Sequence, residues 1–167
     1  MSEGAIASRR TIAVVDIDGV LADVRNRLHH ISGPHKDWAA FFAEIDQDPV
    51  LPEGQKLVTE LAAEHHVVYM TGRPEHTRDA TAGWLKRHGL PAGRVLMRAD
   101  DDHRPARDAK LRLVRKIGSW GWPIAVVVDD DPAVCRKLAD AGWTARQATW
   151  MPRGPALIQA QEAEGST

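Results

Sequence analysis

Residues 12–19 read Ile-Ala-Val-Val-Asp-Ile-Asp-Gly, a short apolar run that ends in two aspartates. A continuous apolar run of this length is typical of a strand that is buried on both faces, as in a parallel sheet. Asp16 and Asp18 lie two residues apart in extended chain, so both side chains point to one side, about 6–7 Å apart. The stretch predicts a buried strand that carries a pair of carboxylates at its carboxyl end.

Similar apolar runs alternate with segments of helical periodicity along the chain. The apolar runs cover residues 66–70, 94–97 and 124–128, and residues 142–148 form a possible short fifth strand. Apolar residues recur at helical spacing over residues 53–64, 75–88, 107–117 and 132–141. This alternation predicts an α/β fold, a Rossmann-like parallel sheet of about five strands flanked by helices.

The 167 residues predict one domain over residues 11–160, with a frayed N-terminus over 1–10 and a polar, frayed tail over 161–167. The insert over residues 22–51 is too long for an ordinary loop between a strand and its helix. It contains one helical stripe of apolar residues, Trp38, Phe41, Phe42 and Ile45. We therefore expect a small flap with one helix, packed mainly by that stripe, over a site that stays open or is closed only by a partner subunit.

The composition excludes several classes of protein. The 22 Lys and Arg residues nearly balance 23 Asp and Glu residues, which argues against a protein that binds nucleic acid by bulk charge. The single cysteine, Cys135, excludes an internal disulfide and a multi-cysteine metal site. No apolar run approaches the ~20 residues of a membrane span, and no secretory signal is recognisable. We expect a cytoplasmic enzyme or binding domain without membrane contact, and a homo-oligomer is compatible with the sequence.

Polar residues follow the other predicted strands as well. The second strand ends in Thr71-Gly72-Arg73 and the fourth in Asp129-Asp130-Asp131. Because ligands of open α/β sheets bind at the carboxyl ends of the strands, these residues are expected to meet at one edge. Asp131 precedes Pro132 and is expected to cap the next helix. Several carboxylates at one edge need a cation, and oxygen ligands favour Mg²⁺ over zinc.

The pair Asp16 and Asp18 can bracket a phosphorus atom. One carboxylate can attack while the other delivers a proton to the leaving oxygen. Thr71 offers a hydroxyl and neighbouring N–H groups to phosphate oxygens, and Lys110 could neutralise the charge that grows in the transition state. Without the other residues, Lys110 would be read as part of a solvated helix face.

The ordered set of these residues resembles the four motifs of the haloacid dehalogenase superfamily of aspartate-nucleophile phosphatases, over roughly residues 11–150. The matching stretches are Asp16-Ile17-Asp18-Gly19-Val20-Leu21, Thr71-Gly72-Arg73, Lys110 and Asp129-Asp130. The resemblance implies that Asp16 is the nucleophile and that Asp18 is the acid/base, with its carbonyl on Mg²⁺. It also implies that Asp129 and Asp130 hold the metal, either directly or through water, and that Thr71 and Lys110 complete the catalytic set.

A narrower likeness is to the 3′-phosphatase domain of polynucleotide kinases. Arg27 lies eleven residues after Asp16, as in that branch, and Arg73 matches its second-motif arginine. One departure is Ala106, where that branch usually has an acidic residue four positions before the lysine. The flap is locally basic, so Arg25 and Arg27, with Gly72 and Arg73, are candidates for binding a phosphorylated substrate. The plainer interpretation of the flap, histidines included, is a mixed surface loop.

The sequence predicts a Mg²⁺-dependent phosphomonoesterase with an aspartyl-phosphate intermediate, acting on nucleic-acid 3′-phosphate ends. A nucleotidase or small-metabolite phosphatase of the same superfamily remains an alternative. Two other classes stay open: a non-catalytic phosphoacceptor domain, and an inactive nucleic-acid-binding domain that uses the basic flap and its aromatic residues.

Overall fold

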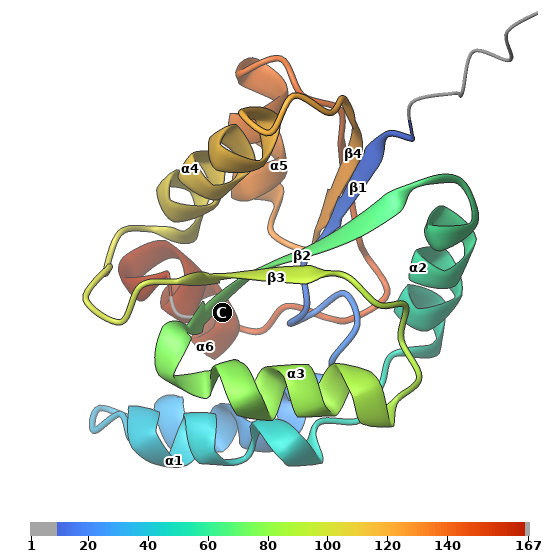
Figure 1. Ribbon diagram of the computed structural model, residues 1–167. Coiled ribbons are helices and arrows are strands. Elements are labelled where there is room, and N and C mark those ends of the chain that lie inside the picture. Colours follow the sequence, from blue (N-terminus) through green and yellow to red (C-terminus); the bar gives the residue numbers. More distant parts are fainter. Residues whose placement is uncertain (1–9, 166–167) are drawn as a thin grey trace, which may run out of the picture.

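The computed structural model describes residues 10–165, and its centre is a sheet of five parallel strands in the order β3-β2-β1-β4-β5 (Figure 1). The strands are β1 (Ile12–Val15), β2 (His66–Pro74), β3 (Arg94–Arg98), β4 (Ile124–Asp129) and β5 (Ala145–Gln147). The predicted α/β fold is confirmed. Strand β2 is longer than the apolar run alone indicates, because its pairing with β3 continues past an irregularity to Pro74.

Strand β1 lies in the middle of the sheet, and all four of its residues are buried. Val15, its last residue, pairs with Tyr69 of β2 on one side and with Val128 of β4 on the other. The chain therefore leaves all three central strands at the same edge. This register brings the ends of β1, β2 and β4 together, although they are far apart in sequence.

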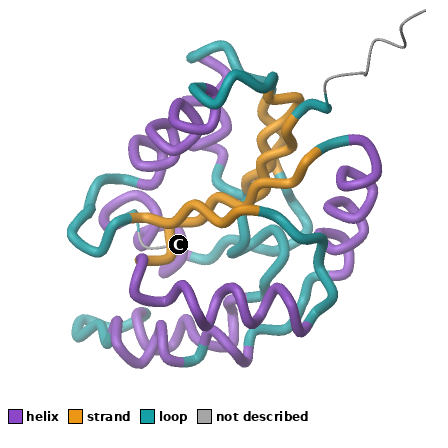
Figure 2. Tube along the Cα trace, viewed as in Figure 1, coloured by secondary structure: helices purple, strands orange, loops and turns teal. Residues whose placement is uncertain are grey.

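Helices cover both faces of the sheet, as Figures 1 and 2 show. Their bounds are α2 (Pro52–Glu64), α3 (Arg78–Arg87), α4 (Ala106–Gly118), α5 (Pro132–Asp140) and α6 (Pro155–Gln159). A short 3-10 turn, η3 (Glu75–Thr77), precedes α3, so the predicted helix over 75–88 is divided. Leu57 of α2 and Trp84 of α3 pack on one face, while Val114 of α4 and Leu138 of α5 pack on the other.

The insert after β1 folds into three short helical segments, η1 (Val24–Ile31), α1 (Trp38–Ala43) and η2 (Ile45–Gln47), which we call the flap. The expected helical stripe is present in α1 and η2. The helical segment η1 was not predicted, although Val24, Leu28 and Ile31 recur in it at helical spacing. Phe41 and Ile45 are completely buried, while Trp38 and Phe42 are half-buried. The stripe therefore acts mainly as the core of the flap.

The expectation of a frayed tail from residue 161 is wrong for residues 161–165. Helix α6 continues into a π-helical turn, η4 (Ala160–Glu164), in which Gln161 is completely buried. This turn is ordered because the Gln161 side-chain amide makes hydrogen bonds to Asp130 and Arg153. Residues 166–167, and residues 1–9 of the segment 1–10 that is predicted to be frayed, lie outside the described residues.

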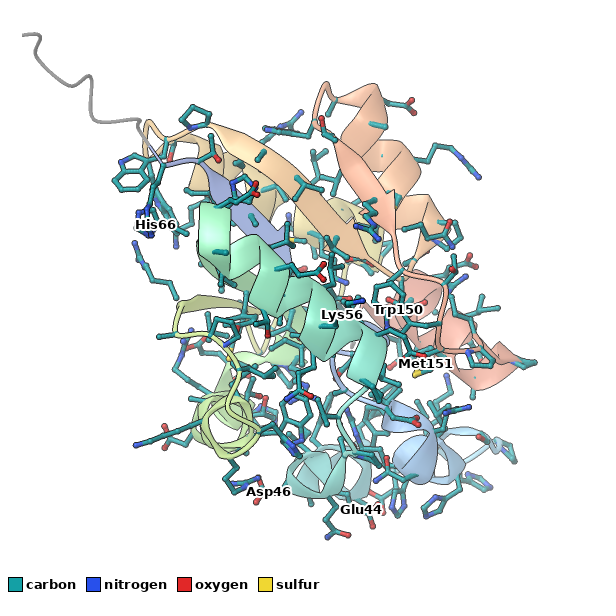
Figure 3. The ribbon with its side chains drawn as sticks, turned by 90° about the vertical axis from the view of Figure 1, so that its right-hand side faces the viewer. Glu44, Asp46, Lys56, His66, Trp150 and Met151 are labelled. Atoms are coloured by element: carbon teal, nitrogen blue, oxygen red, sulfur yellow. The ribbon has the colours of Figure 1, made fainter. Side chains whose placement is uncertain are left out.

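The segment that leads to α6 packs beside the amino-terminal end of α2, where Figure 3 labels Trp150 and Met151. Trp150 Nε1 donates to the Val20 carbonyl at 2.9 Å, and Met151 packs with Leu51 and Leu157. The C-terminal segment is thus tied to the chain just after β1. Within residues 10–165, no helix is long and apolar enough to cross a membrane.

Gly54 of α2 permits a close approach of this helix to the turn after β1. A Cβ atom at position 54 would lie 1.8 Å from the Val20 carbonyl oxygen. We expect Gly54→Ala to lower the free energy of unfolding by about 1–3 kcal/mol, because backbone must shift to admit the methyl group. Urea unfolding followed by circular dichroism measures this.

Gly83→Ala in α3 is the matched control. There the nearest atom to a Cβ would be the end of the flexible Arg87 side chain, at 3.4 Å. This variant should gain roughly 0.5–1 kcal/mol, as alanine usually does in a helix. A stabilised Gly54→Ala would contradict the close packing described here.

Candidate active site

Asp16 and Asp18 stand on the turn that follows β1. Asp16 Oδ1 accepts from the backbone N–H of Ile17 at 2.8 Å. Gly19 has φ +81°, and a Cβ there would lie 2.3 Å from Asp130 Oδ2. Glycine is therefore required at position 19 for two reasons. It adopts this positive φ without strain, and its lack of a side chain lets the Asp130 carboxylate come close.

Three carboxylates gather at the edge of the sheet. One carboxylate oxygen from each of Asp16, Asp129 and Asp130 lies within 4.8 Å of the others, and all three residues are completely buried. Lys110 of α4 donates to Asp16 Oδ2 at 2.9 Å and to Asp129 Oδ2 at 2.7 Å. One ammonium group opposes three carboxylates, and an all-oxygen donor set of this size fits Mg²⁺.

Burial shifts the protonation equilibria of this cluster. Burial and the charge of Asp129 raise the pKa of Asp16 well above its ordinary value, and the same two causes raise the pKa of Asp130 to about 7. Burial alone would lower the pKa of Lys110, but Asp129 and Asp16 outweigh it, and the pKa is raised. The cluster has an excess of buried negative charge, which a divalent cation would offset.

Asp18 has a different environment from Asp16. Its Oδ1 accepts from Arg73 Nε at 2.9 Å, from Arg73 Nη2 at 2.5 Å and from Arg27 Nη2 at 3.3 Å. Burial raises the pKa of Asp18, but Arg73 and Arg27 outweigh burial and hold the pKa below its ordinary value. Asp18 Oδ2 is buried and has no hydrogen-bond partner among the described residues. One oxygen of this carboxylate is therefore available to a ligand.

The match to known families agrees with this geometry. Residues 10–150 match the family model described as the polynucleotide kinase PNKP phosphatase domain. The chain belongs to this PNKP phosphatase family. Its fold and family are those of a haloacid-dehalogenase-type phosphatase domain, as the motifs indicate.

Several solved structures are similar to this chain in fold. One is similar to this chain with a TM-score of 0.69 and 17% identity over 87% of this chain and 45% of its own, and is titled as the Pnkp1/Rnl/Hen1 RNA repair complex. The haloacid dehalogenase-like hydrolase SP0104 from Streptococcus pneumoniae has a TM-score of 0.62 and 14% identity, over 92% of both chains. A class C acid phosphatase from Bacillus anthracis with tungstate bound has a TM-score of 0.60 and 15% identity, over 81% of this chain and 63% of its own.

This chain spans about half of the length of the two chains that it matches in structures titled as Pnkp1/Rnl/Hen1 complexes. A comparison with curated protein sequences gives no match.

The candidate substrate-binding arginines of this PNKP-family domain differ in burial and in their distance from the carboxylates. Arg27 is completely buried beside Asp18, with its guanidinium 4.2 Å from the centroid of the Phe41 ring. Arg25 is exposed and pairs with Asp23, at 2.6 Å between Nη2 and Oδ2. The structure brings Arg27 and Arg73 to the carboxylates and leaves Arg25 at the surface.

Thr71 and Gly72 of strand β2 make hydrogen bonds that fix the second motif, which includes Arg73. Thr71 is buried, and its Oγ1 accepts from the backbone N–H of Arg73 at 3.1 Å. The Gly72 carbonyl accepts from Arg98 Nε at 2.9 Å, and Arg98 also donates to the carbonyls of Ala99 and Asp102. Arg98 thereby anchors the second motif to the end of β3.

The expectation of an open site is not met. Asp16, Asp18, Lys110, Asp129 and Asp130 are each at most 1% exposed. Arg27 of η1 is buried and donates to Asp18, so the flap is connected to this edge of the sheet. The C-terminal segment encloses the cluster from another side.

That enclosure uses two residues that the sequence did not single out. Gln161 Nε2 donates to both carboxylate oxygens of Asp130 at 3.3 Å, and Arg153 Nη2 donates to Gln161 Oε1 at 2.6 Å. Asp131 accepts from the backbone N–H of Ala133 at 2.9 Å, so its predicted role as a helix cap is confirmed. Arg153 also lies 3.4 Å from Asp131.

Asp48 is the most consequential residue that sequence reasoning missed. Its Oδ1 accepts from Arg27 Nε at 2.9 Å and its Oδ2 accepts from Arg73 Nη2 at 3.1 Å, so one carboxylate holds both arginines. Trp84 Nε1 of α3 donates to the Asp48 carbonyl at 2.8 Å. Asp48 belongs to no motif, and only its position beside Pro49 at the end of the flap distinguishes it in the sequence.

The Asp48 carboxyl gives a prediction for pH dependence. Burial raises its pKa to about 6, although Arg27 opposes this shift. A folded-state pKa above the unfolded value contributes stability that is complete below pH about 4 and is lost as the pH rises through 6. Asp48→Asn lacks this titration. Wild type should therefore gain stability relative to Asp48→Asn as the pH falls from 7 to 4.

Urea unfolding of both proteins at several pH values measures this difference, which should change by about 1–3 kcal/mol across the range. The comparison with Asp48→Asn removes groups that titrate equally in both proteins. A difference that stays constant from pH 7 to 4 would show that Asp48 titrates near its ordinary value.

Proposed function

We propose that the chain is a Mg²⁺-dependent phosphomonoesterase that acts through an aspartyl-phosphate intermediate at Asp16. The observation that carries this proposal is the lysine shared by two carboxylates. Lys110 joins Asp16 and Asp129, whereas Asp18 Oδ2 has no hydrogen-bond partner among residues 10–165. Two carboxylates in different electrostatic environments suit two different chemical roles. Asp16 serves as the nucleophile and Asp18 as the acid and base.

In the first step an Asp16 oxygen attacks phosphorus, and the bond from phosphorus to the ester oxygen breaks. Asp18 gives its proton to the leaving oxygen, so the product is an alcohol. Mg²⁺ held by Asp16, Asp129, Asp130 and the Asp18 carbonyl would shield the attacking carboxylate from the anionic phosphate. Lys110 stabilises the negative charge that develops on the transferred group.

In the second step water attacks the phosphorus of the aspartyl-phosphate. Asp18 takes a proton from this water, and the bond between phosphorus and the Asp16 oxygen breaks. Inorganic phosphate leaves, and both carboxylates return to their starting protonation states.

The arginines connect substrate binding to the protonation of Asp18. Without substrate, Arg73 and Arg27 lower the pKa of Asp18. A substrate phosphate that accepts hydrogen bonds from these arginines would weaken their hold on Asp18. Asp18 would then bind a proton more readily at the moment when the leaving oxygen needs one. Thr71 and the neighbouring backbone N–H groups would hold the remaining phosphate oxygens.

We propose nucleic-acid 3′-phosphate ends as the substrate class. Membership of the PNKP phosphatase family supports this, as does the position of Arg27 between the flap and Asp18. The burial of the whole site favours a second candidate, a mononucleotide, because a small substrate needs less movement of the flap. The cytoplasmic location and a homo-oligomeric state are further proposals, and light scattering after size-exclusion chromatography tests the latter.

The nucleophile is tested by phosphate release from a 3′-phosphorylated oligonucleotide, 3′- and 5′-mononucleotides and an aryl phosphate. Wild type should require Mg²⁺ and lose activity in EDTA. Asp16→Asn should lose about 10⁴-fold or more on every substrate, because no attacking carboxylate remains. Asp108→Asn is the control, since Asp108 pairs with Lys137 away from the cluster. Normal turnover by Asp16→Asn would refute the mechanism.

The substrate role of Arg27 is tested with Arg27→Lys, which keeps the positive charge but loses the planar fork. We expect about a 10-fold larger loss on the 3′-phosphorylated oligonucleotide than on the aryl phosphate. Arg25→Ala, in the same segment but at the surface, should change both rates little. If the Arg27→Lys variant loses the same factor of activity on both substrates, Arg27 acts only through its contact with Asp18 and does not bind the substrate.

A further inference from the structure

A second group of metal-ligating side chains lies on the flap. It consists of His29 and His30 at the end of η1 and Glu44 just after α1. One ligand atom from each of the three lies within 4.8 Å of the others. Figure 3 labels Glu44 on the outer side of the flap. None of these residues belongs to the phosphatase motifs.

The contact between His30 and Glu44 does not have the geometry of a simple hydrogen bond. His30 Nε2 lies 3.0 Å from Glu44 Oε1, yet it has no hydrogen-bond partner among the described residues and is shielded from solvent. Two ligand atoms bound tetrahedrally to one zinc ion lie roughly 3.3 Å apart, each aimed at the ion and not at the other. His30 Nε2 and Glu44 Oε1 are therefore close enough for both to bind one small ion, and His30 Nε2 has no other partner among the described residues.

The third ligand lies next to this pair. The His29 and His30 rings have centroids 3.9 Å apart and are inclined by 40°. Two imidazole nitrogens and one carboxylate oxygen form a ligand set that suits zinc and related transition metals. It contrasts with the all-oxygen set of the acidic cluster, so the two sites would select different ions.

Backbone hydrogen bonds already join the two segments that carry the ligands. The His30 carbonyl accepts from the backbone N–H of Asp37 at 2.9 Å, and Asp37 Oδ1 caps α1 by accepting from Ala40 N–H at 2.9 Å. The end of η1 and the start of α1 are thereby joined before any metal binds. A site on such fixed elements loses little conformational entropy when the metal arrives.

We propose that His29, His30 and Glu44 bind one transition-metal ion of the zinc type, with water as a fourth ligand. The ion cross-links η1 to α1, the two segments that hold Arg27: η1 carries this residue, and Arg27 Nη1 donates to the Phe41 carbonyl of α1 at 3.4 Å. Binding therefore stabilises the folded flap. The metal site itself does not depend on the proposed phosphatase activity.

The test is a titration of the full chain with Co²⁺, a visible substitute for zinc, in excess Mg²⁺ to occupy the acidic cluster. We expect one equivalent of Co²⁺ to give the intense visible bands of a four-coordinate site. His29→Gln, His30→Gln and Glu44→Gln should each lower the affinity by at least about 10-fold, because removal of even an outer-shell partner has that effect. His35→Gln, an exposed histidine of the same flap outside the cluster, is the matched control.

A second readout is the midpoint of thermal unfolding, which Zn²⁺ should raise in wild type and His35→Gln but not in His30→Gln or Glu44→Gln. Circular dichroism shows whether each variant is folded. Glu44 is half-buried, so the Glu44→Gln variant still tests the proposal if the His30→Gln variant does not fold. The proposal is overturned if no saturable binding occurs, or if His30→Gln and Glu44→Gln bind as tightly as wild type. It is also overturned if the Co²⁺ bands persist in these variants and are lost in Asp16→Asn.

Discussion

The structure depends on the neutralisation of buried negative charge at one edge of its sheet. Asp16, Asp129 and Asp130 converge there because the parallel strands β1 and β4 end beside each other, within one residue of the Val15–Val128 pair. A buried carboxylate without a partner costs several kcal/mol, so each needs a cation or a hydrogen-bond donor close by. Lys110 serves two of these carboxylates and Gln161 the third. The same imbalance makes the cluster a fitting site for a divalent cation.

The parts of the chain outside the sheet supply the remaining counter-groups. The flap delivers Arg27 and Asp48, β2 delivers Arg73, and together with Asp18 they form a buried network of two guanidinium and two carboxylate groups. Its charges balance internally, unlike those of the metal-type cluster. The two halves of the site therefore differ in electrostatics as well as in ligand chemistry, which separates the proposed nucleophile from the proposed acid and base.

The near-neutral composition conceals this distribution. With 22 basic and 23 acidic residues, the chain carries a formal net charge of −1. Several of those charges lie in the interior, where Arg27, Arg73 and Lys110 are each paired with carboxylates. Net charge describes how a whole protein behaves toward a polyanion, whereas recognition of one phosphate group depends on a few placed donors. The composition thus restricts the proposed polynucleotide role without deciding it.

The sequence by itself determined the parallel sheet and the central residues of the site. Apolar runs that end in Asp16-Ile17-Asp18-Gly19 and Asp129-Asp130 are local patterns, and the parallel topology brings their ends to one edge. The sequence could not reveal the roles of Asp48, Gln161 or Arg153, because a single polar residue in an insert or a tail has no periodicity or spacing that marks it. Nor could it show that Arg27 is buried while Arg25 is exposed, two residues apart. Only tertiary structure decides such points, because the partner that justifies burying a charge comes from a distant part of the chain.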